Sequence, residues 1–192
     1  MDTQTSTSIV NMLKKAMNDQ KVVSVFARRE STDRFFGGYV LNLDEHYLSM
    51  AHISPNGLYD GYVILPIEMI WKVEIGGEYN DTLGVLYRLK KQQHFLLGRT
   101  EGKSVIEQVL AFAQKKQLVV TISITEELDD DAVGFVREFN LEQVAMLMVD
   151  QYGRKNGECN VVIDPIYLLT CDGADEAASK IMFDYRYAAE SC

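Results

Sequence analysis

The chain contains one pattern of punctuating residues twice, first from Phe35 and again from Ala132. Three pairs of glycines keep a constant separation of 96 residues (134 − 38 = 96), and they are Gly38 with Gly134, Gly57 with Gly153, and Gly61 with Gly157. The two prolines taken as equivalent, Pro66 and Pro165, are 99 residues apart, which predicts a three-residue insertion before the second proline. A repeat of half the chain's length indicates a duplicated domain. We therefore expect two domains, residues 1–96 and 97–192.

The composition is that of an ordinary globular protein. Hydrophobic residues make up 47% and charged residues 24% of the 192 positions. No apolar run approaches the roughly 18 residues that a membrane span needs, and the first residues lack the basic and apolar regions of a secretory signal. These observations predict a cytoplasmic protein with no membrane partner.

Charge differs between the two halves of the sequence. Residues 1–96 carry 10 basic and 11 acidic side chains, whereas residues 97–192 carry 9 basic and 17 acidic ones. A net-negative protein repels a phosphate backbone at long range, so RNA binding would need a local basic patch.

Each half reads as a helix, five short strands and a second helix. In the first half, apolar spacing and turn residues predict helices over 5–20 and 81–91 and strands over 22–29, 35–43, 47–53, 62–65 and 70–75. Asn56-Gly57 and Asp60-Gly61 are residue pairs typical of hairpin turns, and Pro66 is expected to break the chain before the fifth strand. Five antiparallel strands at this spacing favour a small barrel.

The second half repeats this order. Ser104 and Glu107 form a capping-box sequence that predicts a helix start, and strands are expected over 118–125, 132–139, 144–149, 160–163 and 168–171. A final helix begins at Ala174, with an apolar stripe of Ala174, Ala177, Ala178, Ile181, Met182 and Tyr185. Tyr87-Arg88 and Tyr185-Arg186 are taken as equivalent. The predicted fold class is mainly β with flanking helices (α+β).

This pattern resembles the Sm-like family. The shared features are an N-terminal helix, five strands, a glycine in the second strand (Gly38) and an acidic residue at the turn into the third (Asp44). The resemblance implies two tandem five-stranded Sm-like or SH3-like barrels, each with an N-terminal and a C-terminal helix. In RNA-binding Sm proteins an asparagine four places after the aspartate contacts the base, and the second motif contains an Arg-Gly pair. Here Leu48 and Leu65-Pro66 occupy those positions, and the second copy has Val144 and Asp164-Pro165, so the family's RNA pocket is not expected.

A glycine-rich string before the second half nearly matches a phosphate-binding loop. Gly98 to Ser104 contains Gly-Lys-Ser at a predicted helix start, but three residues separate the two glycines where the motif requires four. We interpret this string as a linker that caps a helix. No catalytic residue, metal ligand or cofactor is predicted, and the protein is expected not to be an enzyme.

Histidines and cysteines also give no metal-site pattern. The three histidines do not pair at ligand spacing, and the three cysteines share no C-x-x-C spacing, so incidental thiols are expected. The acidic run over 126–131 is interpreted as a solvated hairpin loop, with cation binding as the alternative.

Six residues are predicted to contact a partner: Arg28, Arg29, Arg34, Tyr59, Arg154 and Lys155. The three arginines flank the loop that matches the acidic run in the second copy, which favours head-to-tail self-association or an anionic partner, with ordinary solubilising charge as the alternative. Tyr59 is expected to be exposed at a hairpin tip. The predicted function is a non-enzymatic interaction or regulatory module with a protein partner or self-association. The alternative is an RNA-binding protein that uses these basic residues.

Overall fold

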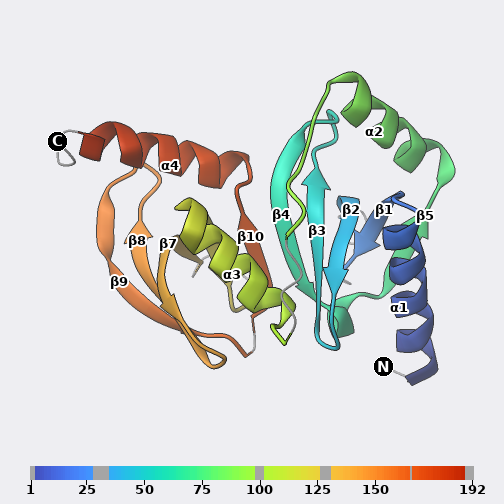
Figure 1. Ribbon diagram of the computed structural model, residues 1–192, viewed down its shortest axis with the longest axis horizontal. Coiled ribbons are helices and arrows are strands. Elements are labelled where there is room, and N and C mark those ends of the chain that lie inside the picture. The colour runs from blue at the N-terminus through green and yellow to red at the C-terminus, as the bar shows by residue number, and fades with distance from the viewer. Residues whose placement is uncertain (1–2, 28–34, 98–101, 126–130, 165, 189–192) are drawn as a thin grey trace. The chain divides into compact units, whose positions relative to one another are not determined.

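The computed structural model describes residues 3–27, 35–97, 102–125, 131–164 and 166–188 (Figure 1). The chain divides into two compact units, Met1–Arg99 and Thr100–Cys192, called unit 1 and unit 2 below. The sequence repeat placed the division three residues earlier. Each unit is described by itself.

Unit 1 begins with a helix, continues with five strands and ends with a second helix. Its elements are α1 (Thr3–Asn18), β1 (Val22–Phe26), β2 (Phe36–Leu43), β3 (Tyr47–Ile53), β4 (Tyr59–Pro66), the 3-10 turn η1 (Ile67–Met69), β5 (Lys72–Ile75) and α2 (Gly77–Leu89). The strands pair antiparallel in the order β5-β1-β2-β3-β4.

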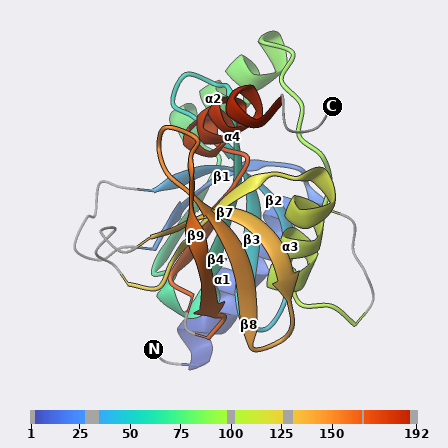
Figure 2. The same ribbon diagram turned by 90° about the vertical axis from the view of Figure 1, so that its left-hand side faces the viewer.

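Unit 2 has the same plan. Its elements are α3 (Val105–Lys116), β6 (Val119–Ser123), β7 (Ala132–Phe139), β8 (Gln143–Val149), β9 (Lys155–Val162), β10 (Leu168–Cys171) and α4 (Ala174–Tyr187). The order β10-β6-β7-β8-β9 matches that of unit 1 strand for strand. Figure 2 shows the long, curved strands β7, β8 and β9 of this unit. The protein is therefore mainly β with flanking helices. Within the described residues no ladder joins β4 to β5 or β9 to β10, so the described pairings close neither sheet.

From the second strand of each unit onward, the pairing registers are identical after a shift of 96 residues. Gly38 pairs with His52 as Gly134 pairs with Met148, and both ladders are interrupted at the same place, after Val40 and after Val136. The β3–β4 and β8–β9 ladders also agree at every described pair, including the second interruption. The sequence repeat therefore marks equivalent backbone positions from the second strand of each unit onward.

The assumed equivalence of Pro66 and Pro165 is wrong. Pro66 is the last residue of β4 and pairs with Tyr47, and the matching residue of β9 is Val162, which pairs with Gln143. Pro165 lies outside the described residues, but the Ile70-to-Ile67 backbone hydrogen bond recurs as Ile166 to Ile163, again 96 residues on. No insertion precedes the second proline. A proline at a strand's end needs no ladder donor, so another residue can replace it there.

Two strands begin earlier than the turn residues predicted. β4 starts at Tyr59 and β9 at Lys155, so Asp60-Gly61 is not a hairpin turn. Gly61 has a φ of 76°, and the pairing register shifts between Ala51 and Ile53 opposite it. The extra residue of such a bulge often has a positive φ, which glycine adopts at low cost. Gly61, and Gly157 in unit 2, therefore belong to a bulge.

The first hairpin glycine of each unit lies against the closing helix. A Cβ added to Gly57 would lie 2.5 Å from Leu86 Cβ, and one added to Gly153 would clash with Met182. Leu86 on α2 and Met182 on α4 make the same contact and are 96 residues apart, so Tyr87 corresponds to Phe183. The predicted equivalence of Tyr87 with Tyr185 is wrong by two residues.

A buried polar side chain on each closing helix bonds to the sheet. Asn80 Oδ1 accepts a hydrogen bond from Ser24 Oγ at 2.8 Å, and Asn80 Nδ2 donates to the carbonyls of Glu74 and Gly76. Glu176, also buried, occupies the matching place and accepts from the hydroxyls of Thr121 and Thr170. Buried polar groups with satisfied partners fix a helix in one position.

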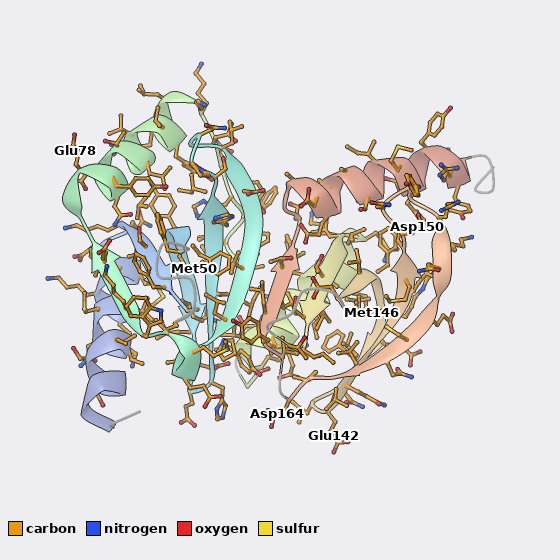
Figure 3. All side chains as sticks on the ribbon, turned by 180° about the vertical axis from the view of Figure 1, so that it is seen from behind. Met50, Glu78, Glu142, Met146, Asp150 and Asp164 are labelled. Atoms are coloured by element: carbon orange, nitrogen blue, oxygen red, sulfur yellow. The ribbon has the colours of Figure 1, made fainter. Side chains whose placement is uncertain are left out.

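The interiors are apolar and again equivalent. Met50 and Met146, 96 residues apart, are both fully buried and are labelled in Figure 3. The closing helix α4, in contrast, exposes much of its predicted apolar stripe, since Ile181 is 67% and Tyr185 81% exposed while Phe183 packs on the core. Within the described part of the chain no helix has the length and apolar character required to cross a bilayer.

Candidate functional site

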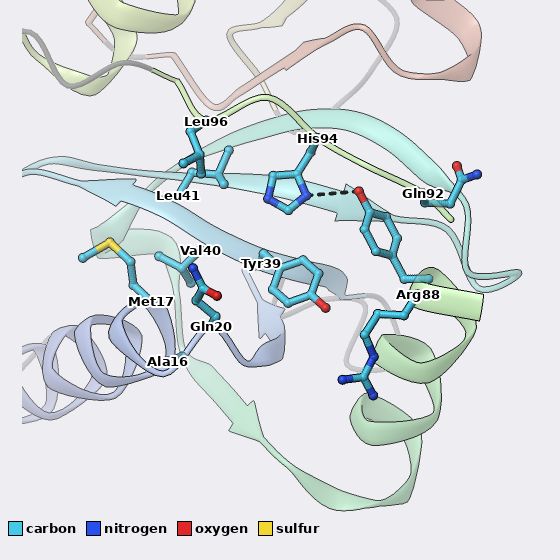
Figure 4. A pocket seen from close by; sticks show the side chains of 11 residues that line it. Ala16, Met17, Gln20, Tyr39, Val40, Leu41, Arg88, Gln92, His94 and Leu96 are labelled. Atoms are coloured by element: carbon cyan, nitrogen blue, oxygen red, sulfur yellow. Dashed lines mark hydrogen bonds between the residues drawn. The ribbon is translucent and has the colours of Figure 1, made fainter. Parts of the chain in front are cut away.

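Unit 1 contains a pocket of about 380 Å³ between α1, β2, α2 and the segment that follows α2 (Figure 4). Both helices end here with a residue in the left-handed conformation, Gln20 (φ 50°) and Lys91 (φ 53°). These residues turn the chain back, and the next amides satisfy the last helical carbonyls, as in Lys21 N to Ala16 O and Gln92 N to Tyr87 O. The pocket volume lies within the usual range for small-molecule sites.

An aromatic cluster forms one wall of this pocket. The rings of Tyr39 and His94 stack with centroids 5.4 Å apart, and the Tyr87 ring meets Tyr39 edge-on at 5.7 Å. The Tyr87 hydroxyl and His94 Nδ1 are 3.0 Å apart and hydrogen-bonded, as the dashed line in Figure 4 shows. Aromatic pairs in these arrangements add stabilisation beyond the area they bury. The wall is therefore a fixed surface.

Burial sets the protonation of these three groups. It raises the pKa of Tyr87 to about 12, and it also raises the pKa of Tyr39, which the charge of Arg88 partly offsets. Burial lowers the pKa of His94 below its ordinary value of 6.5. At neutral pH the cluster therefore presents neutral rings, with hydroxyl groups able to hydrogen-bond.

One cation and two amides border the same pocket. Arg88 projects from the last turn of α2, and Gln20 and Gln92 stand at the ends of the two helices. Among the described residues no carboxylate pairs with Arg88. The guanidinium is therefore available to an anionic group in the pocket.

The segment after α2 is held on unit 1. Tyr59 N donates to Gln92 Oε1 at 3.1 Å, and the Tyr62 hydroxyl donates to the carbonyl of Phe95 at 3.1 Å. Leu97 is buried, whereas Leu96 is exposed at the pocket edge. This connector, residues 92–97, thus supplies His94 as pocket wall and continues toward unit 2.

The equivalent surface of unit 2 lacks the two tyrosine hydroxyls of this wall. Phe135 and Phe183 stand where unit 1 has Tyr39 and Tyr87, and their rings are 4.7 Å apart. Asp184 replaces Arg88. The two units keep the same backbone registers but differ in side-chain chemistry at this place.

Unit 2 has a pocket of about 370 Å³ at a different place, between β6, β10 and α4. Ser123, Asp131 and Asp175 lie there, at positions that Phe26, Phe35 and Tyr79 fill with packed rings in unit 1. No group of three acidic, histidine or cysteine side chains within the described ranges could hold a metal ion.

The predicted contact residues do not come together at the unit 1 pocket. Arg28, Arg29 and Arg34 lie outside the described residues, as do residues 126–130 of the acidic run. Tyr59 is half-buried and packs against the cluster that contains Tyr87, so the expected exposed hairpin tip is wrong. Leu58 is the exposed residue there.

Arg154 and Lys155 lie at the β8–β9 hairpin of unit 2. Arg154 Nε pairs with Asp150 Oδ2 at 2.7 Å, and hydrogen bonds from the Arg154 backbone and side chain help to lower the pKa of Asp150. Lys155 Nζ lies 4.1 Å from the centroid of the Tyr187 ring. Arg186 Nε donates to the Tyr152 carbonyl beside them. These cations and rings form one exposed surface.

Other sequence motifs have structural roles. Ser104 and Glu107 form both hydrogen bonds of the predicted capping box, so that prediction is confirmed. His52 pairs with Asp60 at 3.3 Å. Cys171 is buried and Cys159 half-buried, and burial raises the pKa of both thiols. Leu48 and Val144, at the positions of the Sm base contact, are fully buried.

Sequence reasoning missed Tyr39, Tyr87, Arg88 and His94. The signal was present, because aligning the two copies shows Tyr39 against Phe135. The misplaced equivalence of Tyr87 with Tyr185 hid the second such replacement, since it paired tyrosine with tyrosine.

Comparison with known proteins adds no assignment. No protein-family model matches the sequence, and no curated protein matches it. Among solved structures, the crystal structure of MrkH from K. pneumonia is matched over 97% of this chain and 94% of that chain, with 8% identity. The TM-score of that match is 0.18, so no argument about fold or function is drawn from it.

Proposed function

We propose that this protein is a non-enzymatic cytoplasmic interaction and regulatory module built from two Sm-like (SH3-like) barrels, and that unit 1 binds a small ligand in its aromatic pocket. The matching strand order, registers and flanking helices of the two units support the duplicated barrel. The step from this architecture to a function is an argument by analogy.

The observation that carries the proposal is that units 1 and 2 have different side chains at structurally equivalent positions. Unit 1 has Tyr39, Tyr87 and Arg88 where unit 2 has Phe135, Phe183 and Asp184 at the matching positions. The tyrosine pKa values are raised, which disfavours phenolate formation at neutral pH and suits a binding role better than proton transfer.

Regulation follows from the place of His94. Because this residue lies on the connector and is bonded to Tyr87, a ligand that touches the aromatic wall also touches the segment leading to unit 2. If the ligand binds one conformation of the connector more tightly than the others, ligand binding increases the population of that conformation. A protein partner or self-association completes the proposal, and the exposed apolar side chains of α4 support it.

Nuclear magnetic resonance (NMR) with a set of soluble aromatic and aliphatic fragments tests the ligand-binding role. We expect some fragments to shift the amide signals of Met17, Leu41 and Leu96 and to be recovered chemically unchanged. If no fragment shifts these signals, or if a fragment is converted and His94→Ala abolishes the conversion, the proposal is wrong. Light scattering that shows a strict monomer would remove self-association.

RNA binding is the second candidate, and the hairpin surface of unit 2 favours it. Three cations, Arg154, Lys155 and Arg186, lie beside the Tyr152 and Tyr187 rings, an arrangement suited to stacked bases and phosphates. Single-stranded RNA should then bind at 50 mM salt and dissociate at 200 mM. Lys155→Glu and Arg186→Glu should abolish binding if this surface is used, and Arg28→Glu with Arg29→Glu if the other predicted patch is used. Salt-independent binding would contradict both.

A further inference from the structure

The geometry points to a planar aromatic anion as the ligand of the unit 1 pocket, with its ring against the apolar side of the pocket and its acidic group on Arg88. This inference rests on the proposed binding function and adds the chemical class of the ligand. The pocket joins two kinds of surface that such a molecule requires.

The first is an apolar surface. Val40 is buried in the pocket floor, while Leu41 and Leu96 are partly or largely exposed, so they present apolar area that a ring can cover. The stacked Tyr39 and His94 rings form the adjoining wall. Aromatic ligands gain from both contacts, because covered apolar area leaves water and ring edges and faces interact favourably.

The second is an exposed positive group, Arg88, at the edge of the pocket. Arg88 is close enough to Tyr39 for its charge to act on that hydroxyl, and within the described chain no carboxylate neutralises it. The remaining polar groups of the pocket are neutral hydroxyls and amides, and no acidic side chain lines it. At the two helix ends the carbonyls of Ala16 and Tyr87 accept hydrogen bonds from the amides of Lys21 and Gln92. The C-terminal ends of both helices carry partial negative charge, so Arg88 is the group that must attract an anion here. A guanidinium binds a carboxylate by two parallel hydrogen bonds.

Unit 2 shows what the chain does without such a site. At the matching positions unit 2 has Asp184, which pairs with Lys180 Nζ at 2.5 Å, and phenylalanines in place of the two tyrosines. The matching place in unit 2 therefore lacks the arginine that would hold an anion in unit 1.

The test compares two probes of the same shape, 2-naphthoate and the neutral 2-naphthamide, by NMR titration of the full chain. We expect naphthoate to shift the signals of Leu41 and Leu96 and to bind more tightly than the amide. Arg88→Gln should weaken naphthoate binding about tenfold, as expected for loss of one charge-assisted contact, and leave naphthamide unchanged. Lys91→Gln is the matched control, because it removes the same charge three residues away without lining the pocket, and it should affect neither probe.

The outcomes separate the two levels of the proposal. Equal affinity for both probes, or equal effects of Arg88→Gln and Lys91→Gln, would refute the proposal that the ligand is an anion. The proposal that unit 1 has a ligand pocket would still stand. If neither probe shifts pocket signals, the ligand-binding function itself is contradicted. Circular dichroism of each variant confirms that the fold is retained, which is expected because both side chains are exposed.

Discussion

Gly57 holds the β3–β4 hairpin against α2, and its replacement by alanine should destabilise unit 1 strongly. The new Cβ would lie 2.5 Å from Leu86 Cβ and 3.3 Å from the backbone of Tyr87. Carbon atoms in contact prefer about 3.5–4.0 Å, so α2 or the hairpin must move by about 1 Å. Overpacking of this kind costs about 1–3 kcal/mol, and the φ of 72° adds about 1 kcal/mol for a residue with a side chain.

Gly77 supplies the control. It also has a positive φ, of 83°, but a Cβ there would meet nothing within 4 Å. Gly77→Ala should therefore lose only about 1 kcal/mol, whereas Gly57→Ala should lose about 2–4 kcal/mol.

Urea unfolding followed by tryptophan fluorescence measures both variants. The single tryptophan, Trp71, lies in unit 1 with its ring 5.6 Å from Phe26, so its signal reports the unfolding of that unit. With a slope of about 2 kcal/mol per molar urea, a loss of 3 kcal/mol lowers the midpoint by about 1.5 M. Equal midpoints for the two variants would refute the assigned contact between hairpin and helix.

Three further predictions concern stability. Asn80→Ala leaves the Ser24 hydroxyl and the Glu74 carbonyl without their buried partner, so unit 1 should lose about 2 kcal/mol in the same urea assay, and an unchanged midpoint would count against this bond network. Ser104→Ala removes the cap of α3 and should cost about 1 kcal/mol, measured by thermal denaturation with circular dichroism, while Ser54→Ala in the exposed hairpin serves as comparison. Burial lowers the folded pKa of His52 and His94 below 6.5, so the unfolded chain binds more protons there; stability should be complete above pH 6.5 and fall as the pH drops through that value. His52→Gln with His94→Gln should flatten this dependence, and greater stability at pH 5.5 than at pH 7.5 would contradict it.

The repeated glycines correctly predicted equivalent positions in the two units, whereas the prolines did not. Gly38 lies so close to the Ala51 carbonyl, and Gly57 so close to Leu86, that a side chain is excluded, and both exclusions recur in unit 2. Pro66 sits at a strand end where Val162 serves equally well, so matching prolines misplaced the register. Three of the predicted strands, 47–53, 132–139 and 168–171, have the observed bounds, because apolar residues and flanking turns mark both ends.

The pocket could not be read in the same way. Its residues come from four segments separated by up to 80 positions, and none of them forms a recognisable motif. Only the fold brings Arg88 to Tyr39 and folds the connector back so that His94 reaches Tyr87. The contact residues predicted from charge and turns depended on exposure alone. Tyr59 is half-buried because β4 begins there, three residues earlier than predicted.

The central claim is that unit 1 holds the ligand site and that the equivalent surface of unit 2 does not. Intermolecular nuclear Overhauser effects between the ring protons of bound 2-naphthoate and methyl groups of the full chain test it most directly. We predict contacts with the methyls of Met17, Leu41 and Leu96. Contacts with Val136 or other unit 2 methyls in their place, or no contacts at saturating probe, would contradict the account.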